Sequence, residues 1–112
     1  MGKFIYGTPS DQVEIDDRAL AHLRTVISAK LRRNESFMFT WSHPLSEGSG
    51  QSAFWIHPSI PLHFVFSGSR DIGLNRTWLE ALMAASNSVA GLHLVPEMAP
   101  VPEDESRIDR GA

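Results

Sequence analysis

The spacing of apolar residues changes near Ser36, and this change limits what the chain can fold into. Upstream, between 20 and 31, apolar side chains recur at the spacing of one buried helix face: Leu20, Leu23, Ile27 and Leu31. Downstream, Phe37, Phe39 and Trp41 share one parity, as in a strand with one buried face. A helix followed directly by such a strand predicts that helices pack on a sheet.

The rest of the chain extends this pattern to eight elements. Residues 3–15 predict a β-hairpin, and a helix follows from a cap at Asp16 or Asp17 to about Arg33. The remaining elements are strands at 36–42, 52–57 and 62–66, a helix from Asn75 or Thr77 to about Gly91, and a strand at 92–95. The order ββαβββαβ predicts an α+β fold with two helices on one face of a largely antiparallel sheet.

Side-chain parity predicts which residues face those helices. The three middle strands should form a meander whose covered face consists of Phe37, Phe39, Trp41, Phe54, Ile56, Leu62, Phe64 and Phe66. On the first helix, the same reasoning places Arg18, His22 and Thr25 on the outer side, away from the apolar stripe.

Length and charge predict one domain and one tail. We expect a single domain over 1–96 and a disordered acidic tail over 97–112, which is rich in proline and charge and poor in apolar residues. The whole net charge of −3 lies in that tail, so the body is neutral and offers little field to attract nucleic acid.

Several classes of site and location are disfavoured by composition. The absence of cysteine excludes disulfides, thiolate nucleophiles and cysteine zinc sites. No apolar run approaches the roughly 18–20 residues that span a bilayer, and the N-terminus has no apolar signal core. We therefore expect a cytoplasmic protein without a membrane partner.

The stretch FWIHPSIPLHFVF, residues 54–66, could be a turn or a metal clip. A symmetric hairpin over Pro58 to Leu62 would set His57 opposite His63, because both prolines withhold amide donors where pairing must stop. Two histidines could ligate zinc, but zinc needs at least a third protein ligand and none lies nearby. We therefore predict a turn, with no metal and no cofactor.

The sheet face that two helices leave open is the predicted functional surface. It should carry an apolar patch with a polar rim, formed by Met38, Thr40, Trp55, His57, His63 and Val65. Such patches mark partner sites. We predict a non-enzymatic interaction module that self-associates as a homodimer or other homo-oligomer, or that binds another protein.

A second, weaker signal lies before the second helix. Ser69, Arg70 and Arg76 could contact an anion or a nucleic acid, because free amides and a helix dipole point there. An ordinary loop explains the same residues, since neither the phosphate-loop pattern nor G-x-G-x-x-G is present. No G-x-S-x-G elbow or other catalytic motif occurs, so we predict no catalytic residue, and an enzyme would need a pocket that the sequence does not reveal.

Four segments carry a resemblance: GKFIYGTP, IDDRALAHLRTVISAKLRRNESFMFTW, WIHPSIPLHFVFSGSR and LNRTWLEALMAASNS. Together they resemble a family of short actinobacterial domains of unknown function, whose members often carry the label "ATP-dependent DNA ligase". Ligase chemistry needs a lysine in a K-x-D-G motif, and neither Lys3 nor Lys30 is in one. The resemblance implies an alternative function, a nucleic-acid-binding accessory domain linked to DNA repair or ligation, without catalysis of its own.

Overall fold

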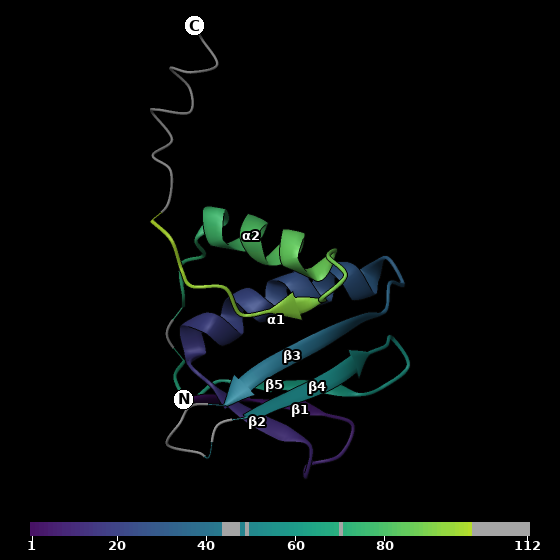
Figure 1. Ribbon diagram of the computed structural model, residues 1–112. Helices are drawn as coiled ribbons and strands as arrows, with labels where there is room; N and C mark the ends of the chain where they lie inside the picture. The colour runs from purple at the N-terminus through teal and green to yellow at the C-terminus, as the bar shows by residue number, and fades with distance from the viewer. Residues whose placement is uncertain (44–47, 49, 70, 100–112) are drawn as a thin grey trace, which may run out of the picture.

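The computed structural model describes residues 1–43, 48, 50–69 and 71–99, and both helices lie on one side of the strands (Figure 1). The predicted element order and the α+β class are confirmed. The elements are β1 (Gly2–Tyr6), β2 (Gln12–Ile15), α1 (Asp17–Arg32), β3 (Phe37–His43), β4 (Gly50–Ile56), β5 (Leu62–Val65), α2 (Arg76–Ser86) and β6 (Leu92–His93).

The strands form two three-stranded sheets with the orders β2-β1-β5 and β4-β3-β6. All pairs are antiparallel except β3 with β6, which is parallel. The predicted meander of the three middle strands is therefore wrong in its last step. Strand β5 pairs with β1, where His63 lies opposite Ile5 and Val65 lies opposite Lys3.

Tyr6 gives a physical reason why β5 pairs with β1 and not with β4. Its hydroxyl donates a hydrogen bond to the Trp55 carbonyl and accepts one from the His57 N–H, at 3.0 Å, at the end of β4. The following turn is closed by the Ile60 N–H on the His57 carbonyl, and the Pro61 carbonyl accepts from the Gly7 N–H. The chain thus leaves β4 in a turn, as predicted. The end of β1 binds this turn, and the strand that follows the turn, β5, pairs with β1.

Phe4 on β1 joins the two sheets into one core. Its side chain is completely buried, and its ring centroid lies 5.2 Å from that of Phe39 and 5.5 Å from that of Phe54, both edge-on. The residues that were predicted to form the covered face all belong to this core. Three of them are buried, namely Phe37, Phe39 and Ile56, and the others are partly buried and pack against the buried cluster: Trp41, Phe54, Leu62, Phe64 and Phe66.

Both helices begin at side-chain caps that the sequence predicts. The Asp16 carboxylate accepts hydrogen bonds from the N–H groups of Arg18 and Ala19, at 3.1 and 3.3 Å. The Asn75 side chain does the same for Thr77 and Trp78, so Asn75 and not Thr77 caps α2. These bonds satisfy amides that a helix start leaves without internal partners.

Gly91 provides a test of how closely β6 approaches β3. Its φ is +84°, and a Cβ built there would lie 2.7 Å from the Met38 carbonyl oxygen. We expect Gly91→Ala to lower the free energy of unfolding by about 1–3 kcal/mol, because both the backbone conformation and the contact oppose a side chain. Urea denaturation measures this loss. Gly73→Ala, where a Cβ meets nothing within 4 Å, is the control that should change little.

Candidate functional site

The outer face of sheet β4-β3-β6, which we define by Met38, Thr40, Ala53 and Trp55, is the strongest candidate surface. The β3–β4 register sets Met38 opposite Trp55 and Thr40 opposite Ala53. Met38 is 37% exposed and Trp55 is 54% exposed, although both belong to paired strands. Two large apolar side chains are thus side by side in solvent, on the face opposite to Phe37, Phe39 and Phe54.

Only part of the predicted partner site lies together. Met38, Thr40 and Trp55 share the outer face, but His63 and Val65 belong to β5 in the other sheet. The predicted register of His57 opposite His63 is therefore wrong. His57 instead begins the turn, where its Nδ1 is 2.7 Å from the Ser59 hydroxyl oxygen and accepts from the Ser59 N–H at 3.1 Å.

The outer face has a chemistry that suits a neutral partner. Strands β3 (FMFTWSH) and β4 (GQSAFWI) contain no lysine, arginine, aspartate or glutamate. Single-stranded nucleic acid is held by aromatic stacking together with cations that follow its backbone. The outer face offers Trp55 for stacking, but the two strands that build it supply no cation.

The loop before α2 was the second predicted site. Two surface hollows, with volumes of about 390 and 730 Å³, lie on this loop and share Gly68, Ser69, Asp71 and Ile72 as lining residues. Ser69 is thus in a hollow, whereas Arg76 lies on α2 and contacts Glu80 at 3.8 Å. Arg70, the third predicted contact, lies outside the described residues.

The Asp17 carboxylate already binds the backbone N–H groups of this loop to which an anion would bind. Its carboxylate accepts hydrogen bonds from the N–H groups of Ser67 and Gly68, at 3.2 and 3.0 Å, and from the Ser67 hydroxyl at 3.0 Å. The Ser67 amide in particular lowers the pKa of Asp17 below its ordinary value. Three aspartates, Asp16, Asp17 and Asp71, line these hollows together with two arginines, Arg18 and Arg24, so the lining has no excess of positive charge to attract an external anion.

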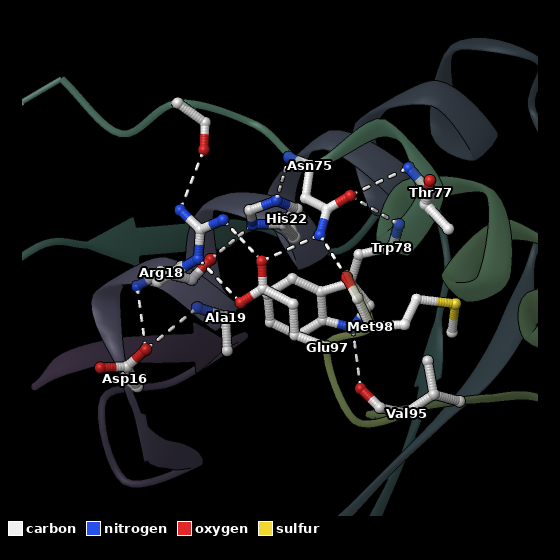
Figure 2. Close-up of polar contacts among 11 residues, drawn as sticks. Asp16, Arg18, Ala19, His22, Asn75, Thr77, Trp78, Val95, Glu97 and Met98 are labelled. Carbon is white, nitrogen blue, oxygen red and sulfur yellow. Dashed lines mark hydrogen bonds and ion pairs between the residues drawn. The ribbon is translucent and has the colours of Figure 1, made fainter. Parts of the chain in front are cut away.

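A polar network at the start of both helices was not predicted (Figure 2). Arg18 makes two hydrogen bonds to the Glu97 carboxylate, at 2.8 and 2.6 Å, and a third to the Gly73 carbonyl at 3.0 Å. The Asn75 amide donates to Glu97 at 3.0 Å and to the Met98 carbonyl at 2.7 Å. Glu97 and Met98, assigned from the sequence to a disordered tail, therefore contact the body of the domain.

His22 stands at the centre of this network and is fully buried, so its predicted place on the outer side of α1 is wrong. Its Nδ1 lies 2.7 Å from the Arg18 carbonyl oxygen, and its Nε2 accepts the Asn75 N–H at 2.8 Å. This pattern fixes the neutral tautomer that carries its proton on Nδ1. Both ring nitrogens are occupied, so His22 supports the structure and is not placed to act as an acid or base.

A signal for His22 was present in the sequence. Ala19 and Val26, at i−3 and i+4 from His22, are both apolar and both buried. They indicate a second apolar stripe beside the first, which α2 and its N-cap cover. No comparable signal marks Glu97, whose partners Arg18 and Asn75 are distant in the sequence.

The described residues offer no metal centre. Among them there is no group of three or more histidines, aspartates or glutamates placed to hold one ion. In the same part of the chain, neither α1 nor α2 is long and apolar enough to cross a membrane.

Comparison with protein families gives a match to the domain of unknown function DUF7882 over residues 1–97. The chain belongs to the DUF7882 family. This confirms the resemblance to a short family of unknown function. Searches of curated proteins and of solved structures found no match. The match to DUF7882 ends at Glu97, the residue whose carboxylate binds Arg18 and Asn75.

The Glu97 contacts of this DUF7882 domain predict a dependence of stability on pH. The bonds from Arg18, and then from Asn75, lower the pKa of Glu97 from 4.5 to about 2. Because the folded pKa is the lower one, the stabilisation is complete above about pH 4.5 and is lost as the pH falls towards 2. We expect Glu97→Gln to lower the melting temperature at pH 7, with a difference from the parent that shrinks across this window.

Thermal unfolding at several pH values between 2 and 7 measures this difference. Glu80→Gln is the matched control, because its pair with Arg76 is long, at 3.8 Å, and highly exposed. Its melting temperature should follow that of the parent at every pH. A Glu97→Gln variant that does the same would contradict the role given to Glu97.

Proposed function

We propose that this DUF7882 domain is a non-enzymatic interaction module that binds a second copy of itself through the outer face. One observation carries the proposal, namely the adjacent exposure of Met38 and Trp55 in a cross-strand pair. In an antiparallel sheet, residues in such pairs lie close enough to form one continuous patch. Exposed apolar patches with polar surroundings are typical of protein interfaces, where tryptophan and methionine are enriched.

Charge favours a second copy over a charged partner. The strands of the outer face carry no formal charge, so two copies can approach without like charges being buried together. An uncharged apolar surface is also complementary to itself. A homodimer related by a two-fold axis would place the same patch on both sides of the contact.

Sedimentation velocity over a range of concentrations tests this function. We expect the parent to show a concentration-dependent dimer, and Trp55→Ala to weaken it by about tenfold or more, because buried aromatic anchors dominate interface energies. Leu74→Ala is the matched control, since Leu74 is 49% exposed but lies beside α1, where it lines a hollow together with Ala21 and Arg24. A parent that stays monomeric at every concentration would overturn the proposal.

The alternative, a nucleic-acid accessory domain, rests on the ligase label that the resemblance carries and on Trp55 as a stacking platform. Two cations of the domain are held by acidic groups at close range, Arg18 by Glu97 at 2.6 Å and Lys30 by Glu35 at 3.1 Å, and are therefore less available to a phosphate backbone. Fluorescence anisotropy with single-stranded and duplex DNA at low salt separates the two functions. Salt-sensitive binding that Trp55→Ala abolishes would favour the alternative.

A further inference from the structure

Strand β4 is an edge strand that lacks the usual protection. The two sheets end in four edge strands, β2, β5, β4 and β6. Of these, β4 is the longest, with seven residues, and it contains neither a charged residue nor a proline. Proteins generally protect edge strands from pairing by short length, charge or proline. Strand β4 therefore has the features of a strand that pairs with another chain.

The direction of its backbone groups follows from Tyr6. In an antiparallel strand, the N–H and C=O of one residue point to the same side, and successive residues alternate. The Trp55 carbonyl and the His57 N–H both bind the Tyr6 hydroxyl, on the side away from β3. The N–H and C=O groups of Gln51 and Ala53 must point the same way. Within the described part of the chain, they have no hydrogen-bond partner on that side.

We infer that β4 pairs antiparallel with β4 of a second copy, about a two-fold axis beside Ser52, and so makes one continuous six-stranded sheet. This inference rests on the proposed self-association and specifies its geometry: β4, which carries Ala53 and Trp55 of the outer face, makes the contact, and the two outer faces lie side by side on one face of the joined sheet. Gln51 lies opposite the partner's Ala53, and Ala53 lies opposite the partner's Gln51. Each of these two residue pairs exchanges two hydrogen bonds, so all the unpaired groups of Gln51 and Ala53 find partners.

The same register joins the two outer faces. Gln51, Ala53 and Trp55 share one parity, so their side chains lie on one face of the joined sheet. Trp55 lies diagonal to the partner's Gln51, within reach of a large aromatic side chain. Ala53 is small and leaves room for the indole there. The exposed pair of Met38 and Trp55 is thereby extended across the junction.

A single cysteine tests the register directly, because the chain has no cysteine of its own. Ser52 of each copy faces Ser52 of the partner subunit in a non-hydrogen-bonded pair, where the side chains are close enough for a disulfide. Under mild oxidation, we expect Ser52→Cys to give at least about tenfold more covalent dimer than Ser42→Cys, whose cysteine lies on the central strand β3. Equal cross-linking of the two variants would overturn the register.

Ala53→Pro tests the pairing by a second route. Its N–H points away from β3, so proline removes an edge donor from each copy without breaking a β3–β4 hydrogen bond. We expect the dimer to weaken by about tenfold or more in sedimentation velocity. If Ala53→Pro does not fold, hydrogen exchange of the parent replaces it. The Gln51 and Ala53 amides should then become protected as protein concentration rises.

The outcomes separate this inference from the proposed function. A dimer that Trp55→Ala weakens but Ala53→Pro leaves unchanged would keep the function and overturn the strand pairing. A monomeric parent would overturn both. A dimer that both substitutions weaken, with selective cross-linking of Ser52→Cys, supports both.

Discussion

Replacing Phe4 with alanine should lower the free energy of unfolding by about 3–5 kcal/mol, a large share of the roughly 5–15 kcal/mol of a typical domain. The Phe4 ring is completely buried and contacts rings from both sheets, Phe39 and Phe54 on one and Phe64 on its own. Its removal leaves a cavity at the junction of the sheets. Chemical denaturation monitored by circular dichroism measures the loss.

Phe66→Ala is the matched control for Phe4. Phe66 is only partly buried, and the Arg24 guanidinium lies over its ring at 5.2 Å. Its truncation should cost much less than that of Phe4, because part of its surface is already in water and the site can relax. An equal cost for both substitutions would show that Phe4 is not the residue that joins the sheets.

Local pattern was sufficient to predict the elements and the buried faces. The helix caps at Asp16 and Asn75 follow from residue types next to apolar periods, and parity alone placed Phe37, Phe39 and Ile56 in the core. The partner of β5 could not be predicted in this way. It depends on a hydrogen bond from Tyr6 to the end of β4, between residues about fifty positions apart, whereas the loop between β4 and β5 has the length of a simple hairpin.

The sequence predicted only that part of the candidate site which lies on the strand pair β3–β4. Met38, Thr40 and Trp55 lie together because β3 and β4 pair antiparallel, as the predicted meander requires, with these side chains on one face. His63 and Val65 are separated from them by the exchange of strand partners. A helical wheel likewise shows which side of α1 is opposite the main stripe, but it does not show that α2 and residues 97–98 cover that side.

Replacing His22 with alanine is the second substitution for which we expect a large loss, about 3–5 kcal/mol of the free energy of unfolding. The His22 ring packs against Trp78, with centroids 4.4 Å apart, so its loss opens a cavity between the helices. The buried N–H of Asn75 also loses its hydrogen-bond acceptor, which is Nε2 of His22. An unsatisfied buried donor costs more than the net value of the bond itself.

Two variants separate the hydrogen bond of His22 from its volume. His22→Gln keeps a side-chain acceptor for the Asn75 N–H and should recover part of the loss, whereas His22→Leu keeps volume without an acceptor and should not. Thr25→Ala, on the same helix, is the control; it removes only a bond to the Ala21 carbonyl at a half-exposed position and should cost about 0.5 kcal/mol or less. Hydrogen exchange of the Asn75 backbone N–H measures this bond directly, since the N–H should lose protection in His22→Leu and keep it in His22→Gln. If His22→Leu is as stable as the parent and keeps that protection, the His22–Asn75 bond does not hold the two helices together.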